Sequence, residues 1–371
     1  MKKALLTTVF TGYNFGSSLQ AYAGKTILES VGYDCQLVAL KSIVKGRDIR
    51  LKKLITILFR SVMLRKEKGG KSLKTYQSGY RKELIGDSAS RFEKFTEEQL
   101  KPKYCSWSEL KRMAKQCDTC FAGSDQIWNS STLYVDPLYY LRFASAEKRI
   151  AFAPSLGRDF VARYNNKKMA QWISEFAHLS SREDSGVRII KELTGREATQ
   201  LIDPTLMVDG ETWKKRLDIK YKKDNYILAY FLDKPSEKAK NTIKLLKEAL
   251  GCKVIGIPYR FNDMTYCDEI VPSGPFEFVE LVNNAKCVIT DSFHGTAFSI
   301  NLHTPFYTYG RNYGTAESQN SRVVSILKMM KMEDRFEPVD AVGELSNISF
   351  VYSEKVLNEE RIKVKDYINS I

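Results

Sequence analysis

The sequence predicts an α/β protein that is built from two Rossmann-like domains. Short apolar segments with the length of buried strands alternate with segments of helical periodicity, which is the pattern of parallel βαβ units. This alternation stops in the lysine-rich segment 211–224 and then starts again. A chain of 371 residues, 43% of them hydrophobic, is also long enough for two domains of ordinary size.

The first half of the chain is predicted to supply one βαβ array. The apolar run that begins the chain ends at Thr11 and Gly12, and the first helical segment ends at Gly32. Strands are predicted over 3–10, 33–40, 117–124, 148–155, 177–184 and 198–206. Helices are predicted over 17–32, near 160–176, and from the end of the fifth strand to about Thr194.

The second half repeats the pattern. Strands are predicted over 225–233, 252–258 and 287–290, and helices over 236–250, 275–284, from about Thr296, and over 354–369. We therefore expect an N-terminal domain over 1–210 with an insertion at about 41–82, and a C-terminal domain over 211–352. The last helix, within 353–371, is a candidate to pack back on the N-terminal domain.

Cysteine usage and hydropathy indicate a cytoplasmic protein. Seven cysteines stand at irregular spacing, and the N-terminal apolar run is too short for a signal peptide. No segment reaches the roughly 18 to 20 apolar residues that a membrane-spanning helix needs. Cys117 and Cys120 have the spacing of a metal or redox pair, but no second pair accompanies them, so buried thiols are expected. No ligand cluster indicates a metal, and no cofactor is expected.

The net charge of +14 is concentrated in the insertion at 41–82, where fourteen Lys or Arg residues face two acids, a net +12. Inside it, 48–66 combines large apolar and basic residues, which is typical of a helix on an anionic lipid surface. An amphipathic helix packed on its own domain has the same composition, so both interpretations stay open. Nucleic acid is a weaker third interpretation, and no such partner is expected, because no recognition motif accompanies the charge.

Functional side chains in parallel sheets lie on the loops at the carboxyl ends of the strands. Those loops are predicted at 11–18, 123–129, 153–157, 180–184, 203–206 and 290–296. The last loop contains His294, one of three histidines in the chain. It is followed by Gly295, which leaves room for a ligand, and by Thr296, which is suited to begin a helix whose amides could hold an anion.

Three further candidates follow other predicted strands. Arg182 carries a guanidinium group that suits a carboxylate or a phosphate, and Asp125 and Gln126 follow a third strand. Each has a structural alternative, because Arg182 could pair with Glu183 or Asp184 and Asp125 could cap a turn. The shared edge of the predicted sheets makes His294 and Arg182 the strongest candidates.

Common catalytic and nucleotide-binding motifs are absent from the sequence. The glycine-bearing loop 11–18 lacks GxGxxG spacing, and no acid stands at a strand end about 20 residues further on to hold a ribose. The chain contains no HExxH, Walker lysine or GxSxG motif. A nicotinamide-dependent reaction is therefore poorly supported.

Five motifs carry a resemblance to a known family: GYNFGSSLQAYA, GSDQIWN, SSREDSG, DPTLMVD and TDSFHGTAFSINLHTPF. From about Lys3 to Met330 the chain resembles the polysaccharide pyruvyl transferases, in the branch with a GSDQxWN signature. The resemblance implies a GT-B-like fold, with two Rossmann-like domains whose parallel sheets face a central cleft. It also implies transfer of pyruvate from phosphoenolpyruvate to a sugar of a cell-surface glycan precursor, usually as a ketal that bridges two hydroxyls.

The resemblance assigns residues by position. The family's C-terminal histidine falls on His294, and the arginine of its SxRE-like motif falls on Arg182. Many members have an arginine where this chain has Ser292, so the missing charge is expected from Arg311 or Arg322.

The chemistry of phosphoenolpyruvate agrees with these assignments. Its carboxylate and phosphate match Arg182 and the helix start at Gly295 and Thr296. His294 is expected to be the general acid, or to bind and neutralise the departing phosphate, because histidine exchanges protons near neutral pH. Asp125 is expected to accept the proton of the attacking sugar hydroxyl.

The sugar acceptor is expected on the N-terminal domain. The first loop lacks the acidic GDE form that is common elsewhere in the family and reads Gly16-Ser17-Ser18, so the acceptor of better known members does not carry over. The acceptor-binding candidates are Tyr13, Asn14, Gly16, Gln126 and Trp128, with Trp128 stacking on the sugar.

The expected partners are phosphoenolpyruvate and a glycan or polyprenyl-linked oligosaccharide. A polyprenyl-linked precursor would be presented at the inner face of the cell membrane, where Lys45–Lys66 could contact anionic lipid and hold the enzyme at the periphery of the cytoplasm. Two other function classes stay open: a GT-B glycosyltransferase that uses a nucleotide sugar, and a non-catalytic glycan-binding relative. The sequence carries no signal for an oligomeric state.

Overall fold

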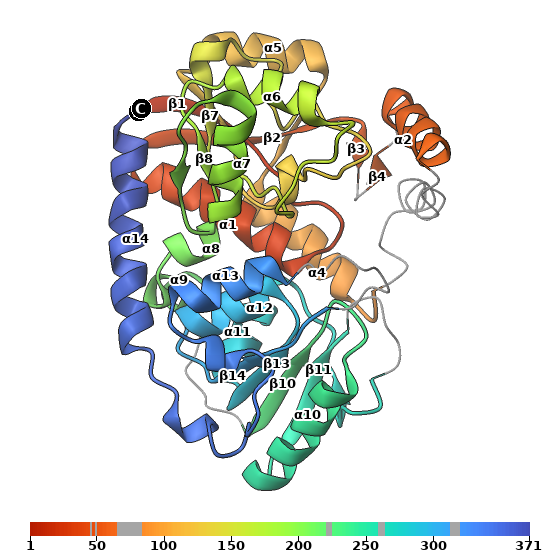
Figure 1. Ribbon diagram of the computed structural model, residues 1–371, viewed down its shortest axis with the longest axis vertical. Coiled ribbons are helices and arrows are strands. Elements are labelled where there is room, and N and C mark those ends of the chain that lie inside the picture. The colour runs from red at the N-terminus through yellow and green to blue at the C-terminus, as the bar shows by residue number, and fades with distance from the viewer. Residues whose placement is uncertain (45–46, 49, 65–83, 220–224, 259–263, 312–319) are drawn as a thin grey trace. The chain divides into compact units, whose positions relative to one another are not determined.

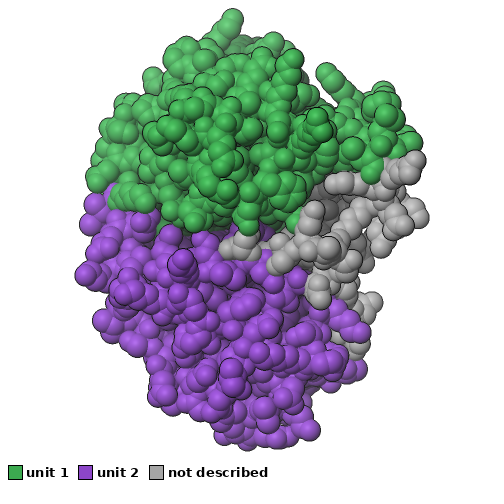
Figure 2. All heavy atoms as spheres, in the orientation of Figure 1, with its two compact units in different colours: residues 1–82, 96–204, 363–371 green, residues 83–95, 205–362 purple. Residues whose placement is uncertain are grey.

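The computed structural model describes residues 1–44, 47–48, 50–64, 84–219, 225–258, 264–311 and 320–371. The chain divides into two compact units, which Figure 2 shows in different colours. Unit 1 consists of Met1–Lys82, Thr96–Pro204 and Lys363–Ile371, and unit 2 consists of Glu83–Phe95 and Thr205–Ile362. The division after Pro204 comes six residues before the expected boundary, and Glu83–Phe95 belongs to unit 2 rather than to the first domain.

Unit 1 contains a five-stranded parallel sheet in the order β5-β2-β1-β6-β7 (Figure 1). Its strands are β1 (Lys2–Thr7), β2 (Tyr33–Leu40), β5 (Lys103–Cys105), β6 (Thr119–Ala122) and β7 (Arg149–Ala151). In chain order this is 3-2-1-4-5, the classic Rossmann order 3-2-1-4-5-6 without its sixth strand. Central β1 pairs Ala4 with Cys35 on one side and with Thr119 on the other.

Helices and two short sheets complete unit 1. The helices are α1 (Phe15–Ser30), α2 (Leu51–Met63), α5 (Trp107–Gln116), α6 (Asn166–Ser174) and α7 (Asp184–Thr194). The short strands are β3 (Ile43–Val44) with β4 (Arg47–Asp48), and β8 (Ser180–Ser181) with β9 (Thr199–Gln200). Helix α5 begins where it does because Ser106 and Glu109 form a reciprocal capping box. Helix α7 ends at Gly195, whose φ of 72° suits glycine.

Unit 2 repeats the same topology with a second five-stranded parallel sheet, β12-β11-β10-β13-β14. Its strands are β10 (Tyr226–Tyr230), β11 (Lys253–Ile257), β12 (Glu269–Ile270), β13 (Cys287–Thr290) and β14 (Phe306–Thr308). The order along the chain is again 3-2-1-4-5. The chain therefore contains the two Rossmann-like units with parallel sheets that the GT-B class requires.

Along the chain, the helices of unit 2 lie before, between and after these strands. They are α4 (Ser88–Phe95), α9 (Gly210–Arg216), α10 (Glu237–Leu250), α11 (Pro275–Asn284), α12 (Phe293–Asn301) and α13 (Ser321–Met329). The short α8 (Pro204–Met207) begins at Pro204, the last residue of the second segment of unit 1. Ser236 caps α10 by accepting a hydrogen bond from the Ala239 N–H, and Gly251 ends that helix with a φ of 57°.

The C-terminal helix α14 (Val351–Asn369) contributes to both units. In unit 2, the Arg361 guanidinium donates to the Leu206 carbonyl at 3.1 Å and to the Asn301 side chain at 2.9 Å. In unit 1, the Tyr367 hydroxyl donates to the Ala151 carbonyl at 2.7 Å, and Ile368 is buried beside it in sequence.

Several elements differ from the sequence-based expectation. Strands β5, β12 and β14 were not expected, because two or three residues are too few to show a period. The strand expected over 177–184 is reduced to the two residues of β8, and the expected seam 211–224 contains most of α9, while 220–224 lies outside the described residues. Within the described residues, no helix is both long and apolar enough to cross a membrane.

Candidate functional site

Each sheet has a topological switch point, at which the strand order reverses. In unit 1 it lies between β1 and β6, and in unit 2 it lies between β10 and β13. The loops that leave the carboxyl ends of such strand pairs diverge and form the usual ligand site of open α/β sheets. The expected candidates Asp125 and His294 follow β6 and β13, so each switch point holds one of them.

In unit 1, the structure brings Asp125 to the first turn of α1. The Ser17 hydroxyl donates to one carboxylate oxygen of Asp125 at 2.6 Å, and the Gln126 N–H donates to the other at 2.8 Å. Asn14 is the N-cap of α1, and its side chain accepts from the Ser17 N–H at 3.0 Å. Sequence reasoning missed Ser17 as a partner, although it belongs to the predicted loop 11–18.

The backbone at this edge of unit 1 is strained. Asp125 has φ 61° and ψ −175°, a region that is otherwise nearly exclusive to glycine. Tyr13 after β1 and Ala153 after β7 also have positive φ values, both of 54°. The Asp125 carbonyl accepts from the N–H groups of Ile127 and Ser155, at 2.7 and 2.9 Å, which holds the residue in place. Strain of this kind collects at functional sites, which supports a role for Asp125.

The other acceptor candidates of unit 1 have structural surroundings. Tyr13 and Gly16 are buried, and Gln126 accepts from the Asn129 side chain at 2.8 Å. Trp128 is fully buried, stacks on Tyr140 at 5.3 Å between ring centroids, and donates from Nε1 to the Tyr139 carbonyl at 3.0 Å. The expectation that Trp128 stacks on a sugar is wrong for this structure, because its ring is fully buried in the core of unit 1 and its Nε1–H is already bonded to the backbone.

Arg182 follows β8, and its side chain pairs with nearby carboxylates, which is the structural alternative to ligand binding. Only 5% of the residue is exposed, and its guanidinium donates to Asp203 at 2.6 Å and to Glu183 at 3.2 Å. Burial lowers the pKa of Arg182, but Glu183, Asp203 and Asp125 outweigh burial and raise that pKa above its ordinary value. Because these carboxylates of its own unit already balance the charge, the surroundings of Arg182 do not support the expected donor-binding role.

Asp203 was missed by the sequence reasoning, although it stands in the predicted loop 203–206. It is fully buried and also accepts a weak hydrogen bond from the Ser124 hydroxyl at 3.5 Å. The sequence pattern could have indicated Asp203, because it follows an apolar segment just as Asp125 does.

In unit 2, Asp291 joins the two loops of the switch point. Its carboxylate accepts from the backbone N–H groups of Leu232 at 2.7 Å and Asp233 at 2.9 Å, which follow β10. Burial raises the pKa of Asp291 to about 6, although Arg311 and the two N–H groups act in the opposite direction. Asp291 was not among the expected site residues, and it too directly follows a buried strand.

His294 is the second residue of α12, immediately beyond this switch point. The helix begins at Phe293, and the side chain of its N-cap Ser292 accepts from the Gly295 N–H at 3.3 Å. His294 is buried, and its ring meets the Phe293 ring edge to face at 5.2 Å. Ser292 therefore shapes the helix start rather than supplying a charge.

Both arginines that were expected to replace the missing charge lie at this helix start. Arg311 donates from Nε to the Asp291 carbonyl at 2.7 Å and lies 3.5 Å from its carboxylate. The guanidinium carbon of Arg322 lies 6.0 Å from the centroid of the Phe293 ring. Arg311 and Arg322 thus lie near the first turn of the helix that carries His294, an arrangement that suits an anion with more than one charged group.

Gly295 and Thr296 have packing roles instead of the expected ligand-binding ones. A Cβ on Gly295 would lie 2.6 Å from the Thr290 hydroxyl oxygen, so glycine is needed where α12 packs on β13. Thr296 is fully buried, and its hydroxyl bonds to the Ser292 carbonyl at 3.1 Å and to the Thr308 hydroxyl at 2.7 Å. The helix begins three residues before the expected start, so Thr296 does not cap it.

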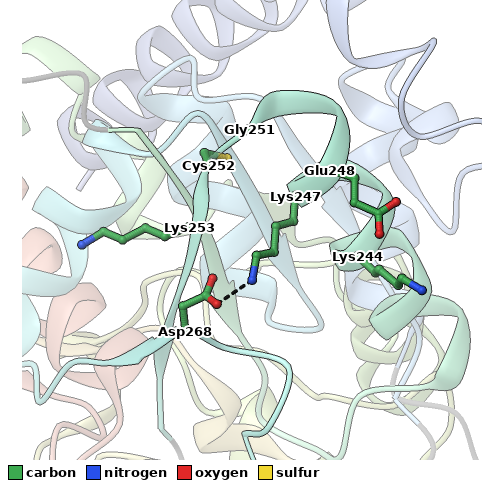
Figure 3. Close-up of a pocket in the computed structure, with 7 residues that line it drawn as sticks. All are labelled: Lys244, Lys247, Glu248, Gly251, Cys252, Lys253 and Asp268. Atoms are coloured by element: carbon green, nitrogen blue, oxygen red, sulfur yellow. Dashed lines mark hydrogen bonds and ion pairs between the residues drawn. The ribbon is translucent and has the colours of Figure 1, made fainter.

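A surface pocket of unit 2 lies away from the switch point. Figure 3 shows its lining at the end of α10 and the start of β11, with Lys247 turned toward Asp268 and bonded to it at 2.5 Å. This is the amino end of β11, whereas ligands of parallel sheets bind at the carboxyl ends. Among the described residues, no group of three or more His, Cys, Asp or Glu side chains is placed to hold a metal ion.

Comparison with known proteins supplies a family and several structures with a similar chain path. The model of the family described as polysaccharide pyruvyl transferase matches residues 14–313. No curated protein matches the sequence. The similar structures include UDP-GlcNAc 2-epimerase from Neisseria meningitidis bound to UDP-GlcNAc, with 10% identity, full coverage of both chains and a TM-score of 0.49. They also include S. aureus MnaA with UDP, with 12% identity, coverage of 100% of this chain and 98% of that chain, and a TM-score of 0.47. The E. coli heptosyltransferase WaaC with ADP-2-deoxy-2-fluoro heptose has 12% identity, coverage of 96% and 99%, and a TM-score of 0.37.

Proposed function

Because the chain belongs to the polysaccharide pyruvyl transferase family, whose model spans residues 14–313, we propose that it transfers the pyruvyl group of phosphoenolpyruvate to a sugar of a cell-surface glycan precursor. The observation that carries the proposal is the group formed by His294, Arg311 and Arg322 at the start of α12. It lies at the switch point of unit 2, where open α/β sheets bind their ligands.

The donor site is proposed in unit 2. Phosphoenolpyruvate carries a carboxylate and a phosphate, and Arg311 and Arg322 provide one guanidinium group for each. The first turn of α12 adds the positive end of a helix dipole. Arg182 is left out of the proposed donor site, because two carboxylates, Glu183 and Asp203, pair with its guanidinium group within unit 1.

The reaction requires a group that donates one proton to a carbon atom of phosphoenolpyruvate. His294 is proposed to protonate the methylene carbon of phosphoenolpyruvate, which leaves an oxocarbenium-like centre at the neighbouring carbon. A sugar hydroxyl oxygen bonds to that centre and loses its proton. The bond from the same carbon to the phosphate oxygen then breaks, phosphate leaves with the electron pair, and a second hydroxyl closes the ketal. The two hydroxyl protons balance the proton gained by carbon and the one taken by phosphate.

The acceptor is proposed to bind at the switch point of unit 1. Asp125 is partly exposed and would accept the proton of the attacking hydroxyl, with Ser17 fixing the direction of its carboxylate. Asn14 and Gln126 are the polar neighbours that would contact the sugar. A precursor on a polyprenyl carrier would place this reaction at the inner face of the membrane, and no cofactor is required by the chemistry.

The proposal is tested by phosphate release from phosphoenolpyruvate with a panel of polyprenyl-linked sugars. We expect release only with an acceptor, and a product heavier by one pyruvate ketal in mass spectrometry. His294→Gln should lower kcat by roughly 100-fold or more, the usual contribution of a general acid. His303→Gln is the matched control, because His303 is half exposed and bonds to Glu354. Turnover of a nucleotide sugar without use of phosphoenolpyruvate would instead show a glycosyltransferase, and acceptor binding with neither reaction would show a non-catalytic protein.

Donor binding is measured separately by calorimetry with phosphoenolpyruvate alone. Arg311→Gln and Arg322→Gln should each weaken binding by about tenfold or more, because each removes a charge-assisted contact. Arg188→Gln is the control, since Arg188 is exposed on α7 and pairs with Glu192. Unchanged affinity in both variants, with folding verified by circular dichroism, would place the donor elsewhere.

A further inference from the structure

Helix α2 exposes a continuous apolar face. The face consists of large side chains that are each 52 to 70% exposed: Leu51, Ile55, Leu58, Phe59, Val62 and Met63. Their spacing of three, four and seven residues puts them on one side of the helix. Surface-exposed apolar residues are normal when scattered, but a contiguous row marks an interaction surface. Figure 1 shows α2 at the edge of unit 1.

The opposite face fixes α2 to unit 1, so the apolar side is held outward. Ile57 and Ser61 are buried there, and Arg50 forms a two-point ion pair with Asp136. Arg60 donates to the Leu133 carbonyl at 3.2 Å and to the Asn165 side chain at 2.9 Å. The helix therefore does not need its apolar face in order to dock on its own unit.

A cationic pocket lies beside this helix. It has a volume of about 200 Å³, and its lining includes Lys52, Arg60 and Lys168 with the aromatic residues Tyr134 and Trp172. None of the described residues that line it is acidic. Burial lowers the pKa of Lys168, and repulsion of its ammonium group by Arg60 and Lys52 lowers that pKa further. An anion with several oxygen atoms would relieve that repulsion.

We propose that α2 docks unit 1 on a lipid bilayer with anionic headgroups, with its apolar face in the interfacial region and a lipid phosphate in the pocket of Lys52, Arg60 and Lys168. A helix with a large apolar face and basic flanks binds bilayers in this way. The net +12 of segment 41–82 adds attraction to anionic lipid.

The positive charge of this surface favours an anionic bilayer over a second copy of the chain as its binding partner. An isologous dimer through α2 would bring together two copies of a helix that carries basic residues and no acid. Like charges across an interface oppose association. A bilayer of anionic lipid presents the opposite sign to the same surface, so it is the complementary occupant. This surface does not depend on the proposed donor or acceptor.

The test is flotation of the full chain with two kinds of vesicle, phosphatidylcholine alone and an equal mixture with phosphatidylglycerol. We expect binding to the mixed vesicles and little to the neutral ones, with loss of binding at high salt. Phe59→Ser with Val62→Ser should lower the partition coefficient by roughly tenfold or more, and so should Lys52→Gln with Lys168→Gln. These variants should keep the fold, because the substituted apolar side chains are exposed.

Matched controls distinguish binding through this surface from nonspecific hydrophobic binding and from nonspecific attraction between charges. Val351→Ser with Ile362→Ser removes exposed apolar side chains of α14, and Lys191→Gln with Lys244→Gln removes exposed cations elsewhere. Both control proteins should bind like the unchanged chain. Equal binding of the α2 and control variants, or no vesicle binding at all, would overturn the proposal.

Two further outcomes would also overturn the proposal in favour of another occupant. A dimer in solution that Phe59→Ser with Val62→Ser dissociates would assign the face to a second copy. Binding of inorganic phosphate that Lys52→Gln with Lys168→Gln abolishes, without any change in flotation, would assign the pocket to free phosphate. Vesicle binding needs no turnover, so its failure is distinct from failure of the pyruvyl transfer.

Discussion

Two carboxylates stand at corresponding places in the two units and have different surroundings. Asp125, after β6, is partly exposed and accepts one hydroxyl and one N–H. Asp291, after β13, is buried and ties the loop after β10 to the start of α12. The partly exposed carboxylate is therefore suited to proton transfer with a substrate, and the buried one positions the start of α12, which carries His294.

The buried position of Asp291 predicts a pH-dependent stability. The carboxyl keeps its proton up to about pH 6 in the folded chain, against an ordinary pKa of 3.8. Between these values the folded state binds more protons than the unfolded state, so the contribution of Asp291 to stability is present below pH 4 and is lost as pH rises through 6. Relative to Asp291→Asn, the unchanged chain should lose up to about 3 kcal/mol of unfolding free energy from pH 4 to pH 7.

Urea unfolding of both proteins across that pH range measures the effect. Asp268→Asn is the control, because hydrogen bonds from Lys247 and the Val254 N–H lower the pKa of Asp268. Its contribution is lost as pH falls instead of as it rises. A constant difference between the unchanged chain and Asp291→Asn would contradict the raised pKa of Asp291.

The places of single residues in the fold were predicted well where they depended only on following a buried strand. His294 and Asp125 follow buried strands, so the sequence alone placed them at the carboxyl edges. The same rule applied to Asp203 and Asp291 would have found them too. Trp128 was misjudged, because an aromatic residue near a loop has the same local pattern whether its ring is buried or exposed.

At the scale of elements, the junction of β13 and α12 depends on close backbone approach. All residues of α12 are buried, and Gly295 lies against Thr290 with no space for a side chain. The Thr290 hydroxyl donates to the Tyr230 carbonyl at 2.6 Å, so it is not free to move aside. The packing of one helix on one strand thus depends on a single missing methyl group.

Gly295→Ala should lower the unfolding free energy by about 1 to 3 kcal/mol, the usual cost of overpacking. Gly24→Ala is the matched control, because that glycine also lies inside a helix but its added Cβ would have no neighbour nearer than 3.8 Å. The control should be neutral or more stable by about 0.5 to 1 kcal/mol, since alanine favours helix. Equal effects in urea unfolding would show that the steric argument fails.

Elements with long periodic patterns were predictable, and short ones were not. The helices α1, α10 and α11 lie close to their expected ranges because glycine, serine or proline marks their ends. The edge strand β12 has two exposed residues, so no apolar run announces it. The start of α12 was placed too late because Thr296 was taken to begin the helix, although Ser292 is the better N-cap type of the two.

At the scale of the whole molecule, unit 1 is assembled from three separate segments of the chain. The last of them, Lys363–Ile371, adds Tyr367, whose hydroxyl bonds to the Ala151 carbonyl at the end of β7. The Tyr367 ring also meets the His178 ring edge to face at 6.4 Å. The sequence indicated the helix of these residues and named the N-terminal domain as a candidate partner, but helical periodicity alone does not decide where a helix packs.

Tyr367→Phe should lower the stability of unit 1 by about 1 kcal/mol, and Tyr367→Ala by about 3 to 5 kcal/mol. The effect of Tyr367→Phe on stability should stay near this lower value, because the Ala151 carbonyl also accepts a hydrogen bond from the Ser180 hydroxyl. Tryptophan fluorescence in urea reports mainly on unit 1, which contains three of the four tryptophans, Trp107, Trp128 and Trp172, whereas Trp213 lies in unit 2. Tyr352→Phe on the exposed side of the same helix is the control and should change nothing.

The three-segment construction of unit 1 also sets an order of events during protein synthesis. Residues 363–371 leave the ribosome only after every residue of unit 2, although they complete the unit with which the chain begins. Unit 2 can therefore fold while unit 1 still lacks the contacts of Tyr367, and a nascent chain has to hold the end of β7 uncovered until translation reaches the last helix. Slow synthesis of the second half of the chain would lengthen the time for which the end of β7 stays uncovered. Unit 1 would then be completed only after unit 2, although most of its residues are synthesised earlier.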